Sequence, residues 1–257
     1  MSVVAILTAA GSGSRLGHAL PKALVRVRGA SMLRHAAAGL LAARGSAGER
    51  VDVLVVTAPS ERLGDFAREL DGLADEPHGP RVLVVAGGPT RQASVAAGLG
   101  AVFSTTDAAS CVLVHDAARP FAPADLIGRV IDAVVAGHPA VVPGLAVVDT
   151  IKRVGGDGAT VVETVRRAEL RAVQTPQGFD AALLRRAHDD AAQHAADEDL
   201  AATDDAGLCE RLGVGVWMVA GDERAAKITT ARDLAVAEVL SGDEVLSGDG
   251  RLTEEDA

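Results

Sequence analysis

The sequence predicts an α/β fold built around a mainly parallel sheet. Short apolar runs alternate along the chain with longer amphipathic stretches, and the first apolar run leads directly into a glycine-rich loop. Such alternation is typical of βαβ units, in which a helix connects two parallel strands. The expected strands are 3–7, 51–57, 82–86, 111–115, 140–143 and 215–219, and the expected helices are 31–44, 60–70, 90–103 and 124–136. Ligands of such sheets bind at the carboxyl ends of the strands, so we expect a site among the loops that follow them.

The loop after the first expected strand has the composition of a triphosphate-binding loop. It reads A-A-G-S-G-S-R-L-G over residues 9–17, and Lys22 follows. Glycines let the backbone approach phosphate oxygens, and Arg15 and Lys22 add positive charge. The spacing matches neither G-x-G-x-x-G, because Leu16 replaces the third glycine, nor a Walker loop. A strand-to-helix turn that needs glycines for backbone reasons alone is the simpler alternative.

Lysine is rare in this chain. Of the 25 lysines and arginines, three are lysines (Lys22, Lys152 and Lys227), so 22 are arginines. In such a composition we expect a lysine where the protein needs a compact, rotatable charge, which the planar guanidinium group does not provide. Chance survival of any one lysine is the alternative.

Composition limits the class of protein. With 257 residues and a net charge of −10, the chain suits one large domain over residues 1–241 and lacks the basic face that a nucleic-acid partner requires. Aromatic residues make up 2%, too few for a platform that stacks single-stranded bases. No apolar run suits a membrane span, and the N-terminal run lacks the basic start of a signal peptide. Cys111 and Cys209 form no disulfide framework, so we expect a cytoplasmic location.

Two segments break the alternation of strands and helices. Residues 146–171 contain two alternating stretches joined by Gly155-Gly156-Asp157-Gly158, which predicts a β-hairpin arm that leaves the core. Residues 242–257 are acidic and poor in large apolar side chains, so we expect a disordered tail there.

Charged residues directly follow the fourth expected strand. The segment reads His115-Asp116-Ala117-Ala118-Arg119-Pro120. A carboxylate at Asp116 suits a hard cation such as Mg²⁺, which triphosphate chemistry requires. A helix-capping aspartate beside a surface arginine is an equally good interpretation of this segment alone.

Other residues are interpreted as structural. The stretch with His188, His194 and several aspartates is expected to be a solvated helix, since two histidines six positions apart do not share a helical face. Cys209 lies on an apolar helix stripe, and we expect it in the core. Trp217 falls in an expected strand and is interpreted as a packing residue.

Seven segments, in family order, resemble the 2-C-methyl-D-erythritol 4-phosphate cytidylyltransferases of the non-mevalonate isoprenoid pathway. They are A-A-G-S-G-S-R-L-G…P-K (9–22), G-G-P-T-R-Q-A-S-V (87–95), V-H-D-A-A-R-P-F (114–121), V-V-D-T-I-K-R-V (147–154), Q-T-P-Q-G-F (174–179), T-D-D-A (203–206) and A-K-I-T (226–229). The resemblance implies a three-layer, Rossmann-like nucleotidyltransferase fold with a protruding β-hairpin arm, and a homodimer formed through that arm. The chain departs from the family at Ala225 and Ala226, which replace the usual Asn-Ile.

The resemblance also implies a reaction and the residues that serve it. A cytidylyl group would pass from CTP to 2-C-methyl-D-erythritol 4-phosphate, giving 4-diphosphocytidyl-2-C-methyl-D-erythritol and pyrophosphate, with Mg²⁺ as cofactor. The catalytic residues would be Arg15, Lys22, Asp116 and Lys227, with Asp116 as the metal ligand. CTP would contact Ala9, Ala10, Gly11, Gly13, Gly87, Gly88, Ser94, Asp116 and Ala117. The acceptor would contact Arg119, Thr150, Arg167, Thr175, Thr203 and Lys227, with Thr150 and Arg167 (or its neighbour Arg166) supplied by the second subunit.

Three other functions fit parts of the pattern. A ribitol-5-phosphate cytidylyltransferase has a similar loop and arm but matches the H-D-A-A-R-P and Q-T-P-Q-G-F segments less well. A sugar-1-phosphate nucleotidyltransferase that uses UTP or GTP would share only the opening strand, loop and lysine. A catalytically silent nucleotide-binding regulator would not need Lys22, Asp116 and Arg119 together.

Overall fold

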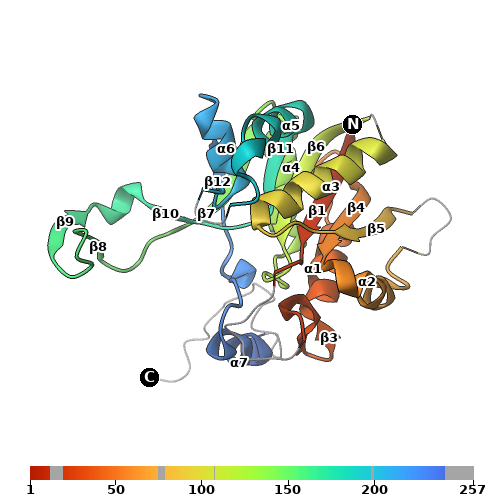
Figure 1. Ribbon diagram of the computed structural model, residues 1–257, viewed down its shortest axis with the longest axis horizontal. Helices are drawn as coiled ribbons and strands as arrows, with labels where there is room; N and C mark the ends of the chain where they lie inside the picture. Colours follow the sequence, from red (N-terminus) through yellow and green to blue (C-terminus); the bar gives the residue numbers. More distant parts are fainter. Residues whose placement is uncertain (12–19, 75–78, 107, 198–199, 241–257) are drawn as a thin grey trace, which may run out of the picture.

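A computed structural model describes residues 1–11, 20–74, 79–106, 108–197 and 200–240 (Figure 1). Two of the predicted site residues, Gly13 and Arg15, lie outside the described residues. The acidic tail expected over 242–257 also lies outside them, so its disorder and the single-domain assignment of 1–241 stay predictions.

A mainly parallel, eight-stranded sheet forms the centre of the molecule. Its order is β10-β7-β11-β6-β1-β4-β5, with β12 paired to β7. The strands are β1 (Ser2–Thr8), β4 (Val51–Ala58), β5 (Arg81–Ala86), β6 (Ala109–Asp116), β7 (Ala140–Ala146), β10 (Arg171–Val173), β11 (Gln177–Asp180) and β12 (Trp217–Ala220). The strands β1, β4, β5 and β6 are parallel neighbours, whereas β10 and β11 run antiparallel to theirs. The predicted fold class is confirmed, and the six predicted strands are all present.

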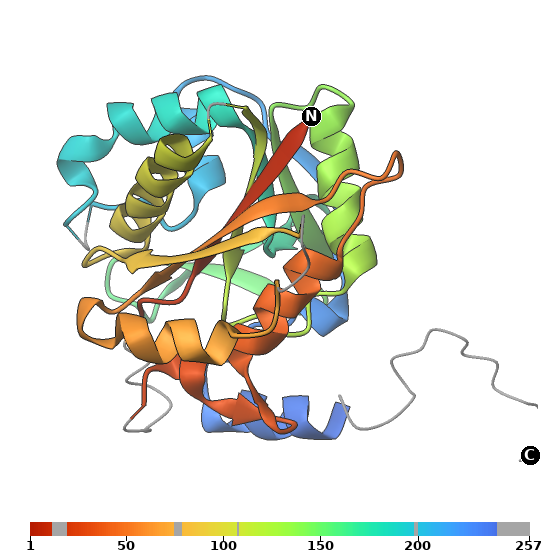
Figure 2. The same cartoon turned by 90° about the vertical axis from the view of Figure 1, so that its right-hand side faces the viewer.

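Helices cover both faces of this sheet, which gives three layers (Figure 2). One layer holds α1 (Met32–Ala42), α2 (Leu63–Leu70) and α4 (Ala124–Val135), and the other holds α3 (Arg91–Thr105), α5 (Ala181–Asp190) and α6 (Asp205–Arg211). Because side chains alternate along a strand, Val3, Ala5 and Leu7 of β1 pack in the first core. Val4 and Ile6 pack in the second, which explains why this strand is apolar throughout.

Two of the four predicted helices, α1 and α3, begin at a residue whose side chain caps them. Ser31 accepts a hydrogen bond from the backbone N–H of Arg34 at 3.0 Å, and Thr90 accepts one from Ala93 at 3.0 Å. Each bond satisfies one of the amide groups that a helix leaves free at its start. The helix expected over 60–70 is divided into a 3₁₀ turn, Ser60–Arg62, and α2.

A second, smaller set of elements lies beyond the sheet. The short strands β2 (Arg26–Val27) and β3 (Ala30–Ser31) form a two-stranded pair, and α7 (Ala231–Leu240) packs against β2. Val25, Val27, Met32 and Ile228 form the apolar cluster between them. This cluster fixes the chain directly after Lys227, because Ile228 belongs to it.

The hairpin arm is present as predicted and projects from the body of the molecule (Figure 1). Strands β8 (Ile151–Val154) and β9 (Val161–Val165) pair antiparallel to each other and to no other described strand. At its tip Gly158 adopts a φ of +69°, a conformation that favours glycine. Val148 is 78% exposed and Val162 65% exposed, so the arm buries little apolar surface within its own chain.

The expectations for single residues have mixed outcomes. Cys111 and Cys209 are both buried and free, as expected, and burial raises the pKa of each thiol to about 12. The interpretation of Trp217 as a core residue is wrong, because its side chain is 52% exposed and stacks on the His138 ring at 4.0 Å. In the described part of the chain, every helix is too short or too polar to cross a membrane.

Candidate active site

Asp116 is the last residue of β6, at the point where β1 and β6 end side by side. The hydroxyl of Thr8, its neighbour in the parallel register, donates to Asp116 Oδ1 at 3.3 Å. Arg91 Nε lies 3.2 Å from the same oxygen, and Lys227 Nζ lies 2.8 Å from Oδ2. The fold thus brings together Asp116 and Lys227, two of the predicted catalytic residues, from opposite halves of the chain.

The charges around Asp116 keep its carboxylate ionised. Burial alone would raise the pKa of this carboxyl, but Arg91 and Lys227 outweigh burial and hold the pKa well below its usual range. Burial would lower the pKa of the Arg91 guanidinium, but Asp205 and Asp116 together raise it above its usual value. The strand end therefore carries a fixed anion with two cationic partners.

A chain of hydrogen bonds runs from the Asp116 backbone through two side chains. The Asp116 N–H donates to Thr175 Oγ1 at 3.1 Å, and Thr175 Oγ1 lies 2.9 Å from His115 Nδ1. His115 Nε2 lies 3.2 Å from the carbonyl oxygen of Arg119. Because a carbonyl can only accept, Nε2 carries the proton and Nδ1 accepts from Thr175. Burial lowers the pKa of His115 to about 4, so the ring is neutral at pH 7.

Arg119 is not the surface arginine of the simpler interpretation. Its Nη1 donates to the carbonyl of Ala225 at 2.7 Å and its Nη2 to the carbonyl of Val173 at 3.3 Å. The N–H of Ile228 donates to the carbonyl of Ala118 at 2.8 Å, so the segment that carries Lys227 is attached beside Asp116. Ala225 serves here through its main chain, which any residue at that position supplies.

The residues predicted to hold CTP line the ends of β1, β5 and β6. Main-chain bonds fix three of them to neighbouring strands: Ala9 to Thr57, Gly87 to Ala58 and Ala117 to Thr8. A Cβ on Gly87 would lie 2.5 Å from Ala10 Cβ and 2.9 Å from Ser94 Oγ, so only glycine fits. Ser94 Oγ in turn accepts from the N–H of Gly88 at 3.1 Å. Ala10, Gly87, Gly88 and Ser94 therefore form one packed group, with Gly11 following in the loop.

The other predicted site residues lie in other parts of the fold. Lys22 opens the 3₁₀ helix Lys22–Leu24, directly after Pro21. Thr203 is exposed and precedes Asp204, which caps α6 by accepting from Gly207 at 3.0 Å. Thr150 and Arg167 are exposed on the arm, where Arg167 Nη1 donates to the carbonyl of Val148 and the neighbouring Arg166 pairs with Glu169. The arm projects away from the body that holds Asp116 (Figure 1).

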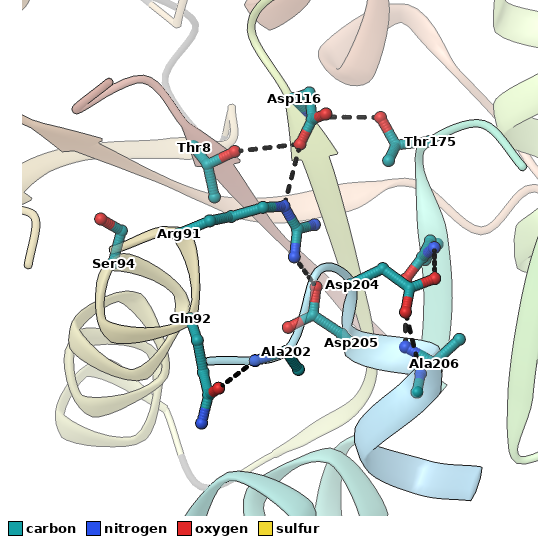
Figure 3. Close-up of polar contacts among 12 residues, drawn as sticks. Thr8, Arg91, Gln92, Ser94, Asp116, Thr175, Ala202, Asp204, Asp205 and Ala206 are labelled. Carbon is teal, nitrogen blue, oxygen red and sulfur yellow. Dashed lines mark hydrogen bonds and ion pairs between the residues drawn. The ribbon is translucent and has the colours of Figure 1, made fainter. Parts of the chain in front are cut away.

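The prediction missed a buried charge network behind Asp116 (Figure 3). Arg91 Nη1 lies 2.7 Å from Asp205 Oδ2, and His188 Nε2 lies 2.9 Å from Asp205 Oδ1. The interpretation of the 188–199 stretch as a solvated helix is therefore wrong for His188, which is 5% exposed and faces Asp205 rather than water. The available signals were that Arg91 and Asp205 both lie within the resembling segments 87–95 and 203–206.

Comparison with known proteins identifies the family. Residues 3–242 match the family model described as IspD: 2-C-methyl-D-erythritol 4-phosphate cytidylyltransferase. The chain belongs to this family. Among similar proteins, the 2-C-methyl-D-erythritol 4-phosphate cytidylyltransferase of Nocardia farcinica is 50% identical over 239 residues, covering 93% of this chain and 94% of that protein. The enzyme of the same name from Streptomyces coelicolor is 45% identical, covering 92% and 83%.

Solved structures of IspD enzymes have the same fold. The 2-C-methyl-D-erythritol 4-phosphate cytidylyltransferase of Thermus thermophilus aligns with a TM-score of 0.68 at 36% identity, covering 94% of this chain and 99% of that one. The 4-diphosphocytidyl-2C-methyl-D-erythritol synthase of Anaerococcus prevotii aligns with a TM-score of 0.78 at 26% identity, covering 94% and 96%. The chain is accordingly an enzyme of the cytidylyltransferase class, within the nucleotidyltransferases.

The donor set at Asp116 fits the metal that this enzyme class uses. Among the described residues, no three His, Cys, Asp or Glu side chains gather into a metal cluster. Mg²⁺ does not need such a cluster, since it usually takes one or two carboxylates and completes its shell with water and substrate phosphates. In the described part of the chain, Asp116 Oδ2 pairs with the Lys227 ammonium, whose side chain is 43% exposed.

Proposed function

We propose that this enzyme transfers a cytidylyl group from CTP to 2-C-methyl-D-erythritol 4-phosphate and releases pyrophosphate. The observation that carries the proposal is the Asp116 cluster at the end of β6, where the carboxylate pairs with Lys227 and lies near Arg119. The group around Gly87 and Ser94 packs beside Ala10, after β5 and β1 of the same sheet. The relatives named above carry this activity in their names.

The charge balance of the site suits two phosphorylated substrates. Arg91, Arg119 and Lys227 surround Asp116, with Asp205 as the second carboxylate, in a chain whose net charge is −10. An excess of cations at one strand end of an acidic protein attracts anions to that point. In this proposal the acceptor phosphate lies near Arg119 and Lys227, with Thr175 and Thr203 beside it.

In this reaction the protein would position the two substrates and stabilise charge, and it would form no covalent intermediate. The acceptor phosphate oxygen attacks the α-phosphorus of CTP in line with the departing pyrophosphate. Negative charge grows on the α-phosphate oxygens toward the transition state, and fixed cations aimed there lower the barrier. In our proposal Lys22 and Arg15 are those cations.

The nucleotide subsite would recognise cytosine mainly through its main chain. Ala9, Ala10 and Gly11 directly follow β1, and Gly87 and Gly88 directly follow β5, so peptide groups rather than large side chains would face the ligand. Ser94 offers a hydroxyl already oriented by Thr90 O at 2.9 Å. Such fixed donors and acceptors discriminate between bases because a wrong edge leaves buried groups unpaired.

A divalent cation, Mg²⁺ in our proposal, would be held by Asp116. When bound, it would neutralise the triphosphate and make the α-phosphorus a better electrophile. Asp116 would keep its tie from Oδ1 to Arg91, while Lys227 would turn from Oδ2 toward the substrate phosphates.

The arm would complete the site of a second subunit. Its apolar side chains are exposed in one chain, and Thr150 and Arg167 lie there rather than beside Asp116. An exposed hairpin gains stability when a partner covers it, and a closed two-fold dimer would exchange two arms at once. We propose a homodimer in which each site takes Thr150 and Arg167 from the partner's arm.

The proposal is tested by measuring pyrophosphate release. Each of the four NTPs is offered with 2-C-methyl-D-erythritol 4-phosphate and, separately, with ribitol 5-phosphate. We expect release with CTP and the methylerythritol acceptor alone. Preference for ribitol 5-phosphate would assign the enzyme to the alternative activity, and CTP binding without release from any pair would identify a silent regulator.

A further inference from the structure

Three consecutive residues at the start of α3 hold one distant segment. Thr90 Oγ1 donates to the carbonyl of Ala195, Arg91 Nη1 pairs with Asp205 at 2.7 Å, and Gln92 Oε1 accepts from the N–H of Ala202 at 2.7 Å. Figure 3 shows the Arg91 and Gln92 contacts side by side at the start of this helix. The residues that they hold lie within 195–197 and 200–205, and the second of these ranges contains Thr203.

The same helix start belongs to the nucleotide group. Ser94, one turn after Arg91, bonds the main chain of Gly88 and Thr90. Arg91 therefore lies between two loops: residues 87–90, which we assign to CTP, and residues 202–205, which we assign to the acceptor. Its third contact is with Asp116, through Nε at 3.2 Å.

The far end of this network is rigid. The Asp205 side chain is 1% exposed and accepts from both Arg91 and His188. Asp204, its neighbour, accepts from Gln177 Nε2 at 2.9 Å, and Gln177 Oε1 accepts from the N–H of Ala206 at 3.2 Å. Both oxygens of Asp205 have a partner, which fixes its carboxylate, whereas Arg91 Nη2 and His188 Nδ1 are buried without a hydrogen-bond partner among the described residues.

We propose that Arg91 is a positioning residue that holds Asp116 and the two substrate loops in one register. Its planar fork spans Asp116 and Asp205 with different nitrogens, which the single ammonium of a lysine does not do. A shift of about 1 Å between donor and acceptor costs in-line transfer roughly a hundredfold. The inference rests on the proposed function, since it assigns the loops by substrate.

The test is a double-variant cycle of Arg91→Gln and Asp205→Asn. Each single variant leaves one buried charge with fewer partners, so both lower the melting temperature and kcat. The double variant removes both charges of the Arg91–Asp205 pair while Asp116 keeps Lys227, so its melting temperature should recover most of the loss, because replacing both members of a buried pair is often nearly neutral. We expect the kcat of the double variant to stay roughly tenfold to a hundredfold below wild type, since Asp116 has lost its hydrogen bond from Arg91.

Recovery of kcat together with the melting temperature would show that the pair serves stability alone and would overturn the proposal. Arg91→Lys covers the case in which the double variant melts too low to assay. Arg91→Lys keeps the positive charge but not the planar fork, so we expect its kcat to fall. A kcat of Arg91→Lys near the wild-type value would also overturn the proposal. The control is Arg62→Gln, the same change at the half-buried Arg62–Asp65 pair on the opposite helix layer, which should leave kcat unchanged.

A binding experiment separates this inference from the proposed function. Calorimetry measures the affinity of 2-C-methyl-D-erythritol 4-phosphate with and without a non-hydrolysable α,β-methylene analogue of CTP. In wild type the nucleotide should tighten acceptor binding, and Arg91→Gln should abolish that coupling. No acceptor binding in wild type would sink the proposed function, whereas equal coupling in wild type and variant would sink the role of Arg91 alone.

Discussion

The end of the parallel sheet and the hairpin arm differ in what holds their functional residues. At the sheet end, Asp116 is positioned by Thr8, Arg91 and Lys227, and the strands beneath it are buried on both faces. On the arm, β8 and β9 pair only with each other in the described chain, and Val162 is 65% exposed. One chain is enough to position and bury the residues around Asp116. The apolar side chains of the arm would be buried only by contact with another chain.

The difference distinguishes the site residues that the sheet positions from the site residues that the arm carries. Groups that must be fixed to a fraction of an ångström lie on the rigid sheet, where many contacts oppose displacement. In the homodimer that we propose, groups on the arm would gain their position from the partner, so assembly would complete the site and activity would depend on the dimer.

The largest effect is expected from Lys22→Ala, at the start of the 3₁₀ helix that follows the glycine-rich loop. Removing a cation aimed at the α-phosphate should cost about 3 kcal/mol of transition-state stabilisation, or a hundredfold or more in kcat. Titration of CTP should show a much smaller loss of affinity. Lys22→Arg should also be poor, because the fork does not replace a point charge. Intact kcat with weakened CTP binding would instead assign Lys22 to ground-state binding.

The arm is tested by mixing subunits. A variant lacking Arg166 and Arg167 and the Lys22→Ala variant should each be nearly inactive alone. Unfolded and refolded together in equal amounts, they give half mixed dimers, each with one intact site if the arm crosses to the partner. Activity should recover to roughly a quarter of wild type. No recovery, with mixed dimers verified by mass spectrometry, would mean that the arm serves its own subunit.

The proposed metal site gives the next effect. Asp116→Asn replaces a charged oxygen ligand with a neutral one, so the Mg²⁺ concentration for half-maximal activity should rise about tenfold or more. A circular dichroism spectrum matching wild type would show that the fold is kept. An unchanged Mg²⁺ titration would remove Asp116 from the list of metal ligands.

Matched valines compare the stability of the two regions. Val112 is fully buried in β6, whereas Val162 is 65% exposed on the arm. Val112→Ala should lower the free energy of unfolding by about 2 kcal/mol, and Val162→Ala by less than about 0.5 kcal/mol. Urea unfolding at low protein concentration measures both. Equal losses would mean that the arm packs on its own subunit, and the contrast between the regions would fail.

The smallest effect concerns His115 and pH. Its pKa is lowered to about 4 by burial, below the unfolded value of about 6.5. Between these values the unfolded state binds the proton and the native state does not, so stability falls as pH drops through this window. Wild type should lose on the order of 1 kcal/mol more than His115→Gln between pH 7 and pH 5. Parallel urea curves for both proteins at each pH would contradict the assignment.

Much of the sheet could be predicted because local pattern and tertiary position agree there. The apolar run of β1 and the caps at Ser31 and Thr90 are local signals. Strands β10 and β11 have three and four residues and pair antiparallel with β7. This pairing depends on β7, which lies far from them in the sequence. Sequence pattern carries no trace of such pairing.

The site residues also divide into those that could be predicted from the sequence and those that could not. The resemblance supplied Asp116 and Lys227 as a pair, and the structure places them in contact. Arg91 and Asp205 escaped prediction because a buried ion pair between residues 114 positions apart leaves no periodic signal. Trp217 was misjudged because a strand at the sheet edge exposes one side, and the pattern of a strand does not say which strand lies at the edge.

The tight packing at Gly87 bears on how the enzyme could escape an inhibitor. A Cβ there would lie 2.5 Å from Ala10 Cβ, and one on Gly88 would lie 2.4 Å from Ala93 Cβ. A resistant variant commonly enlarges a side chain that the compound touches, so that the compound no longer fits. A compound that binds along the main chain of Gly87 and Gly88 contacts two positions where any larger residue would make the same clash. Resistance to it would have to arise elsewhere in the molecule, at positions where a change also costs the natural substrate its contacts.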